Sequence, residues 1–222
     1  MKTLNNYISE ALIKKDTKIS IYNYYPKDIF ELREIIENRL KNDKNADLND
    51  IDVSKITSFC DKTRGQFKDR GLFEGLDPHN IDVSNWNVSE VQDMRRVFFD
   101  CHNLVCDVSK WDVSNVESMS NMFYKCYKFD CDLGNWKFPW CKSLFGMFVK
   151  CSNFKGTGLE KWDVKDVHSF SHMFSDCVNL DVDLNDWNTD SATEYHYMFE
   201  GCDTLERKKL IPDWWRSFTR HT

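Results

Sequence analysis

Five tryptophans recur at a nearly constant spacing and constrain the fold more than any other feature of the chain. They are separated by 25, 25, 26 and 25 residues, and lie at Trp86, Trp111, Trp136, Trp162 and Trp187. A phenylalanine series and a cysteine series keep the same register: Phe98, Phe123, Phe148, Phe174 and Phe199, then Cys101, Cys126, Cys151, Cys177 and Cys202. A repeat of this length predicts a solenoid. Residues found in every unit of a solenoid usually hold the stack together, so we expect these three series to be scaffold.

One unit, from Trp111 to Asn135, divides into three predicted parts. The opening WDVSNV is typical of a turn, because Asp, Ser and Asn side chains bond to their own backbone. Glu117–Tyr127 is predicted to be a short helix, since its apolar residues follow helical spacing: Met119, Met122, Phe123 and Cys126. Phe129–Leu133 alternates apolar and polar residues, which predicts a half-buried strand. Stacked units of this kind predict an α/β fold with a parallel sheet.

The ends of the chain depart from the repeat, as an open stack of units requires. Lys18–Tyr24 is predicted to be a strand and Pro26–Leu40 an amphipathic helix that caps the stack. Leu210–Trp215 is predicted to close the other end. The predicted organisation is therefore an N-terminal amphipathic segment (1–18), a strand–helix cap (19–46), the repeat region (47–205) and a C-terminal cap (206–222).

Three irregularities interrupt the repeat. About ten extra residues lie within Cys60–Gly71, inside the first unit. The third turn reads KFPWC at 137–141, where its neighbours read DVSNV or a close variant. The segment Phe154–Leu159 contains two glycines and the one extra residue behind the 26-residue spacing, which predicts a bulge or bend.

The phrase WDVSNVESMSNMFYKCYKF resembles the 25-residue repeat of BspA-type leucine-rich-repeat proteins, also called the mycoplasma lipoprotein-type repeat. The resemblance covers roughly Asn45–Leu205, and the segments ELREIIENRL and IPDWW resemble the head and the closing segment of such proteins. It implies an α/β, leucine-rich-repeat-like solenoid that binds proteins, often in adhesion when secreted. The short form without a signal resembles versions carried by bacteriophages and mobile elements of gut bacteria.

Composition and charge narrow the class of protein. The net charge of −6 disfavours general binding to nucleic acid or anionic membranes, and no apolar run is long enough to span a membrane. Residues Met1–Lys18 lack the apolar stretch and cleavage site of a secretory signal, so we expect a cytoplasmic location, or the virion if the protein is phage-encoded. Nine cysteines, an odd number, are expected to be reduced and mostly buried rather than paired.

Motifs that carry catalysis or hold cofactors are missing from the sequence. It has no glycine-rich phosphate loop, no GxSxG elbow and no CxxC pair, so we expect neither catalysis nor a cofactor. His168 and His172 have one-turn spacing but no strong third zinc ligand in sequence reach. Asp181–Asp186 alternates acids as calcium loops do, yet lacks their central glycine and distal glutamate. We therefore expect no metal site.

Candidate partner-binding residues are aromatic side chains outside the shared series and acids on the predicted sheet face. The aromatic candidates are Phe138, Trp140, Phe99 and Tyr124, and the acids, which share one repeat position, are Asp107, Asp132 and Asp183. Clustered exposed aromatics are typical of interface hot spots, and an acidic row suits a basic partner. Local packing, for example under the Cys60–Gly71 insertion, is the alternative interpretation of the aromatics and the favoured one.

The combined prediction is a non-enzymatic protein-binding module whose protein partner, a host or virion protein, is not identified by any residue. The alternative is a structural or adhesion component of a larger particle. The first predicts a monomer with an exposed aromatic patch. The second predicts self-association through 1–18 or the end caps.

Overall fold

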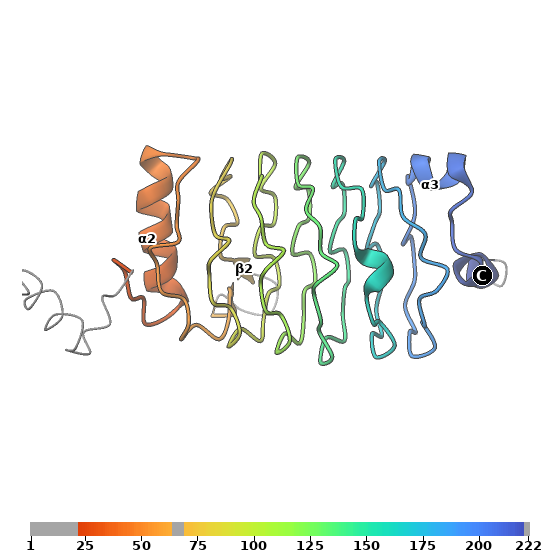
Figure 1. Cartoon of the computed structure of the whole chain (residues 1–222), viewed down its shortest axis with the longest axis horizontal. Coiled ribbons are helices and arrows are strands. Elements are labelled where there is room, and N and C mark those ends of the chain that lie inside the picture. The colour runs from red at the N-terminus through yellow and green to blue at the C-terminus, as the bar shows by residue number, and fades with distance from the viewer. Residues whose placement is uncertain (1–21, 64–68, 220–222) are drawn as a thin grey trace, which may run out of the picture.

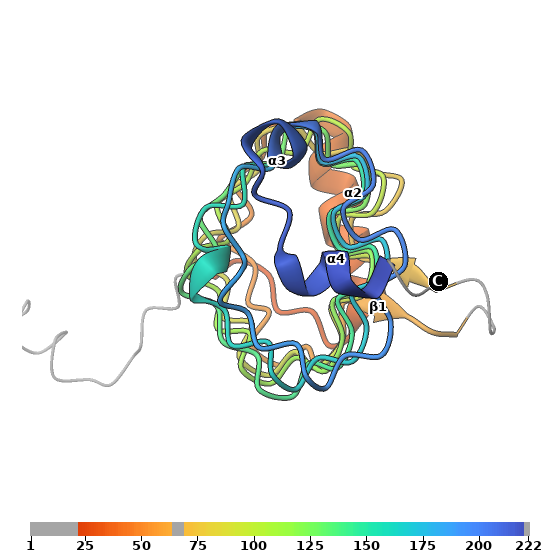
Figure 2. The ribbon, with the colours of Figure 1, turned by 90° about the vertical axis from the view of Figure 1, so that its right-hand side faces the viewer.

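A computed structural model describes residues 22–63 and 69–219 and shows successive units of the repeat side by side along one long axis (Figure 1). Seen along that axis, the turns superimpose around a common interior (Figure 2). Single parallel bridges link one residue per turn to the next: Ser58, Asp93, Ser118, Ser143, Ser169 and Glu194. The predicted segment 1–18 and most of the predicted strand Lys18–Tyr24 lie outside the described residues, although Tyr24 itself bridges Ile51.

Regular elements are few, short, and concentrated near the ends. They are the helices α2 (Ile29–Asn42), α3 (Asp203–Lys208) and α4 (Asp213–Thr219), the strands β1 (Cys60–Asp61) and β2 (Arg70–Gly71), and the 3₁₀ turn η1 (Leu159–Lys161). The helix expected over Pro26–Leu40 begins at Ile29, because the Asp28 carboxylate accepts the backbone N–H groups of Phe30 and Glu31 and caps it. Its buried residues, Leu32, Ile36 and Leu40, face the stack.

The short helix predicted for each unit is absent from the described repeats. In the unit of Trp111, Asn121 (φ 57°) and Lys125 (φ 59°) adopt left-handed backbone conformations, which an α-helix cannot contain. The backbone N–H groups of Asn121, Phe123 and Lys125 instead donate to carbonyls of the next unit, at 2.8, 2.9 and 2.7 Å. The unit thus exchanges hydrogen bonds with its neighbour where a helix would satisfy them internally.

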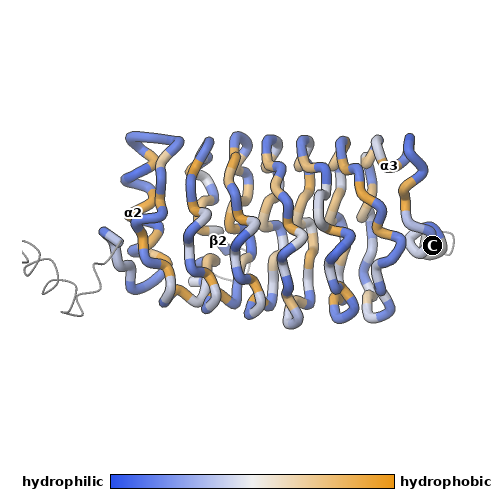
Figure 3. The backbone as a smooth tube through the Cα atoms, in the orientation of Figure 1, coloured by the Kyte–Doolittle hydropathy of each residue, from blue (hydrophilic) through white to orange (hydrophobic). Residues whose placement is uncertain are grey.

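Burial nevertheless follows the predicted pattern closely. Met119, Met122, Phe123 and Cys126 are fully buried, and in Phe129–Leu133 the two acids are exposed while Phe129 and Leu133 are buried. Figure 3 shows this alternation of hydrophobic and hydrophilic segments in every turn. The predicted strand itself is not regular: no strand of several residues pairs along 129–133, and the parallel contacts described are single bridges. The leucine-rich-repeat class therefore stays a prediction.

The three residue series form the interior. Each tryptophan Nε1–H donates to a backbone carbonyl of the preceding turn, for example Trp111 to Val83 at 2.9 Å and Trp136 to Val108 at 2.9 Å. Each cysteine thiol likewise meets a phenylalanine carbonyl of the preceding turn, as in Cys126 to Phe98 at 3.0 Å. The buried indole N–H and thiol groups thus have hydrogen-bond partners, while the rings stack on one another. These residues therefore bury apolar surface and also fix each turn relative to the preceding one.

The C-terminal cap continues the tryptophan series. Trp214, on α4, donates its Nε1–H to the Leu184 carbonyl at 3.0 Å, the same contact that the interior tryptophans make. Its ring lies 6.2 Å from that of Phe199, and Trp215 meets Phe199 edge-on at 5.6 Å. Helix α4 lies across the last turn (Figure 2) and covers apolar surface that the repeat leaves open.

The insertion Cys60–Gly71 includes a two-residue antiparallel pairing, with Cys60 opposite Gly71 and Asp61 opposite Arg70. Ion pairs hold its base: Arg95 contacts Asp69 at 2.7 Å and Asp93 at 3.0 Å. Gly71 is required there, because a Cβ atom would lie 1.6 Å from the Arg96 carbonyl oxygen. The pairing therefore lies directly against the next turn of the stack.

Candidate protein-binding surfaces

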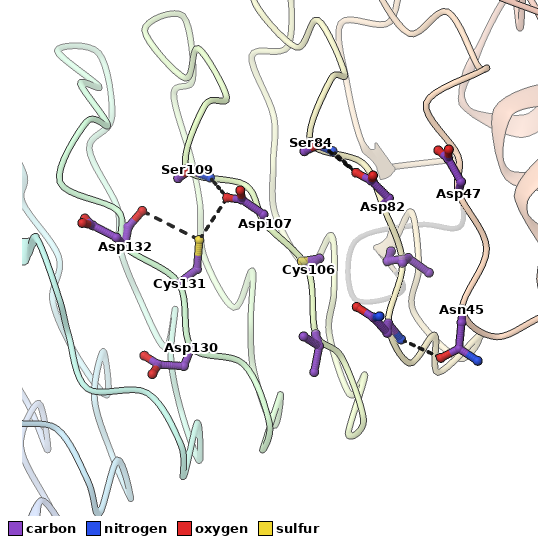
Figure 4. Close-up of a pocket in the computed structure, with 13 residues that line it drawn as sticks. Asn45, Asp47, Asp82, Ser84, Cys106, Asp107, Ser109, Asp130, Cys131 and Asp132 are labelled. Carbon is purple, nitrogen blue, oxygen red and sulfur yellow. Dashed lines mark hydrogen bonds between the residues drawn. The ribbon is translucent and has the colours of Figure 1, made fainter.

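An open hollow of about 750 Å³ lies where four neighbouring turns between residues 45 and 132 pass one another (Figure 4). We call it the acidic hollow and define it by its lining: Asn45, Asp47, Asn80, Ile81, Asp82, Ser84, Val105, Cys106, Asp107, Ser109, Asp130, Cys131 and Asp132. Parallel bridges between Asp47 and Asp82 and between Asn80 and Val105 hold these turns in register. The hollow therefore has a fixed shape set by the stack.

Local turns position the aspartates of the acidic hollow. At Asp82, Asp107 and Asp132 the Oδ1 atom accepts the backbone N–H two residues later: from Ser84 at 3.0 Å, from Ser109 at 2.9 Å and from Gly134 at 2.8 Å. This is the turn that the DVSN pattern predicts. Because one oxygen is held by its own backbone, each side chain is fixed at the surface.

All the charged side chains that line the acidic hollow are acidic. Five aspartates line it and neither lysine nor arginine does. Asp130 pairs with Lys155 at 3.1 Å, whereas no ion pair within the described part of the chain involves Asp47, Asp82, Asp107 or Asp132. Hydrogen bonds from Ser109 lower the pKa of Asp107, and the backbone N–H of Ser84 is the main cause of the lowered pKa of Asp82. Both groups are therefore anionic at neutral pH.

In a neighbouring hollow, by contrast, lysines neutralise the carboxylates. Its lining includes Asp130, Lys155 and Asp181, and Asp181 receives Lys208 of α3 at 2.6 Å. The two acids there each have a lysine partner. Of these two hollows, the acidic hollow is the one in which several carboxylates make no ion pair with a described residue.

The floor of the acidic hollow is partly apolar. Val105 is 46% exposed, which is unusual for an aliphatic side chain on this surface. Cys106 beside it is buried, and the half-buried Cys131 has its Sγ 3.7 Å from the Asp107 carboxylate. Burial raises the pKa of Cys131 to about 11, so the thiol is protonated at neutral pH and unsuited to nucleophilic chemistry. The hollow suits binding through charge and apolar contact.

The candidate acids fall into two groups. Asp107 and Asp132 line the acidic hollow. Asp183 makes the same local turn, accepting the Asn185 N–H at 3.0 Å, but it lies nearer the C-terminus and does not line the hollow. The 26-residue unit separates the two groups, because its Gly156 and Gly158 take left-handed conformations where other units have this acidic segment.

The aromatic candidates of the third turn differ in exposure: Phe138 is buried and Trp140 is exposed. The prediction that Phe138 is an exposed contact is wrong: it is 4% exposed and meets the Trp162 ring edge-on at 4.8 Å. It occupies the position of the buried Val113 and Val164, so the larger side chain fills the core. Trp140 is 62% exposed, the most exposed of the large hydrophobic side chains described.

Phe99 and Tyr124 are half-buried and stack on each other with ring centres 4.6 Å apart. The Arg96 guanidinium lies 3.6 Å above the Phe99 ring, a cation–π contact that covers part of it. Both rings are therefore already engaged in contacts within the molecule.

A further surface column of rings escaped the sequence prediction. Phe145, His172 and Tyr197 contact in series, with ring centres 5.8 and 5.0 Å apart, and Tyr197 is 57% exposed. His172 and Tyr197 occupy the repeat position of Asn121, which is half-buried two units before His172. Following that solvent-facing position to the last unit would have identified the tyrosine.

The described residues contain neither a cluster of metal ligands nor a helix that could span a membrane. No group of three or more His, Cys, Asp or Glu side chains in 22–63 and 69–219 is arranged to hold a metal ion. His172, one of the two spaced histidines, stacks on Tyr197, and its Nδ1 lies 3.3 Å from the Ser175 hydroxyl. None of the helices described has both the length and the apolar character needed to cross a bilayer.

The comparisons with known proteins give one finding. The family model described as "Mycoplasma protein of unknown function, DUF285" matches residues 31–157 and 140–217. Neither the curated proteins nor the solved structures contain a match. Because the matched ranges together cover most of the chain, the protein belongs to the DUF285 family of mycoplasma-type proteins of unknown function.

Proposed function

We propose that the chain is a non-enzymatic protein-binding module, and that the acidic hollow takes an extended, lysine- or arginine-bearing segment of a partner protein. The observation that carries this proposal is that only acidic charged side chains line the hollow, and that four of its five carboxylates make no ion pair with a described residue. Opposite charge across an interface favours encounter and selects the partner. We also propose a leucine-rich-repeat-like solenoid of the BspA type, which the single parallel bridges between units support.

The dimensions of the hollow suit a short extended segment. Its lining aspartates come from four successive turns, and neighbouring strands in a sheet lie about 4.8 Å apart, so the carboxylates extend over about 14 Å. An extended peptide rises about 3.3 Å per residue, so about four or five residues cross the hollow. Val105 supplies apolar contact beneath the cationic side chains.

Calorimetric titration with a peptide that alternates lysine and apolar residues tests the proposal. We expect saturable binding that weakens as salt is added, since exposed ion pairs are screened. Asp107→Asn with Asp132→Asn should weaken binding about 2- to 30-fold, from the roughly 0.2–1 kcal/mol of each exposed pair.

Two controls make that titration specific. Asparagine preserves the local turn: Asn87 and Asn188 already accept the N–H groups of Ser89 and Asp190 in this chain, at 3.3 and 3.0 Å. Asp183→Asn removes one charge from the same kind of turn outside the hollow, and should leave binding unchanged. Equal binding of a peptide with glutamate in place of lysine would contradict the proposal, as would an equal loss in the Asp183 variant.

A further inference from the structure

The turn 137–142, which we call the Trp140 turn, combines an exposed indole with positive charge. Lys137, Pro139, Trp140 and Lys142 are exposed. No ring of the described residues contacts that of Trp140, whereas every tryptophan of the interior series is buried. Asn115 and Asp166 occupy the same position in the adjacent units, so the repeat itself places this side chain in solvent.

The lysines of the Trp140 turn are available for a partner. No ion pair in the described part of the chain involves Lys137 or Lys142, whereas Lys165 in the next unit is paired with Asp163 at 2.8 Å. Lys137 lies near enough to Asp163 to help lower the pKa of that carboxyl, after the larger effect of Lys165. The turn is thus a small basic and aromatic projection on a chain of net charge −6.

The Trp140 turn and the acidic hollow are complementary. One offers an exposed ring between two unpaired lysines. The other offers an exposed valine among carboxylates, four of which make no ion pair with a described residue. Tryptophan is enriched at the centres of protein interfaces, where its ring fills a pocket and a charged rim surrounds it. On the basis of the proposed function of the hollow, we propose that one ligand of the acidic hollow is the Trp140 turn of a second copy of this chain.

The symmetry of this contact follows from its two unlike surfaces. Because each copy carries one turn and one hollow, the contact is head-to-tail, and it closes into a ring or continues as a chain of copies. Trp140 is 62% exposed and does not line the hollow of its own molecule, so the proposed contact needs a second copy. An interface made of one ring and two lysines is smaller than those of stable complexes, so the association is weak and depends on concentration.

Sedimentation velocity over a range of concentrations tests the proposal on the full chain. We expect the mean sedimentation coefficient to rise with concentration and to fall back as salt is added. Trp140→Ala and the double variant Asp107→Asn, Asp132→Asn should each stay monomeric, while Asp183→Asn associates as the unchanged chain does. Unchanged circular dichroism and melting temperature show that each variant folds.

Mixing the two defective variants gives the sharpest result. The Trp140→Ala chain retains a hollow and the double variant retains a Trp140 turn, so the mixture should form a one-to-one complex and nothing larger. A mixture that stays monomeric overturns the head-to-tail contact. A chain that stays monomeric at every concentration while its hollow still binds the lysine peptide overturns self-association and leaves the proposed function intact. Loss of peptide binding with self-association unchanged in the double variant overturns the head-to-tail contact and supports the proposed function. Peptide binding and self-association that both stay unchanged in that variant overturn both proposals.

Discussion

Trp136 and Trp140 lie four residues apart and show how differently the same side chain serves the stack and its surface. Trp136 is 2% exposed, donates its Nε1–H to Val108, and stacks on Trp162 with ring centres 6.4 Å apart. Trp140 is 62% exposed and has no such contact with the described residues. A residue type that recurs in every unit supports the fold, while the same type at a position that is polar elsewhere is available for binding.

The largest expected change in the free energy of unfolding comes from replacing Trp136, and the same replacement of Trp140 is its control. Trp136→Ala should lower the free energy of unfolding by about 3–5 kcal/mol, because it empties a large buried volume and leaves the Val108 carbonyl unpaired. Trp140→Ala should change it by about 0.5 kcal/mol or less, as for other surface positions. Urea unfolding followed by circular dichroism measures both, and similar losses in the two variants would remove the distinction.

The next largest loss of stability is expected where the backbone adopts a left-handed conformation, at Asn121. Asn121 has φ 57°, a conformation that β-branched residues strongly disfavour. Asn121→Val should therefore cost about 1–3 kcal/mol, whereas Asn121→Gly, which matches Gly146 of the next unit at φ 59°, should cost little. Thermal unfolding of the two variants checks the prediction. An equal tolerance of valine would show that the left-handed conformation does not hold the unit.

The cysteine series provides a smaller test. Cys126→Ala removes a buried Sγ and its contact with the Phe98 carbonyl, and should cost about 1–2 kcal/mol. Cys131→Ala alters a half-buried side chain outside the series and should cost less. Chemical denaturation of both variants gives the comparison, and the reverse order would contradict the role of the series.

Alkylation of thiols distinguishes the same two positions by their pKa. Burial raises the pKa of Cys131 to about 11 and the pKa of Cys126 well above its ordinary value. Because the thiolate reacts, labelling of the native chain should be slow at pH 8, faster as pH rises toward 11, and first at Cys131. Mass spectrometry after timed iodoacetamide treatment locates the label. Early labelling of Cys126 would mean that the interior opens.

The smallest stability effect is expected in the acidic hollow. A carboxyl whose folded pKa is lowered stabilises the fold above its unfolded pKa, and this contribution is lost as pH falls through the folded pKa. Asp107 is such a group and is exposed, so Asp107→Asn should cost about 0.5 kcal/mol or less at neutral pH and nothing once the carboxyl is protonated. Unfolding curves at neutral and strongly acidic pH test this, and a larger cost would make the acid part of the scaffold.

Periodicity predicted what is buried better than it predicted the local backbone. The series of Trp, Phe and Cys and the burial of Met119, Met122 and Phe123 follow from spacing, since an interior must be apolar whatever the backbone does. The helical spacing of those same residues does not require a helix. Left-handed conformations at Lys125 and Lys150 are not signalled by residue type, and arise from hydrogen bonds between turns that a single unit does not contain.

The repeat position shared by the candidate acids follows from the sequence, and the structure brings two of them together. Asp107 and Asp132 come together because one repeat position falls on one face of the stack. Phe138 was misjudged although its column, with Val113 and Val164, already indicates burial. Trp214 was not recognised as part of the series, since it follows Trp187 by 27 residues and reaches its place through a capping helix. The lining of the hollow depends on turns brought together in space, which no single unit encodes.

Hydrogen exchange of the chain with and without the lysine peptide tests the central claim most directly. If the acidic hollow binds cationic segments on a stack that stays unchanged, protection should increase in segments 80–84, 105–109 and 130–134, and stay the same in 181–186. The interior series should exchange as slowly with the peptide as without it. Protection confined to 181–186, or spread evenly along the stack, would contradict the claim.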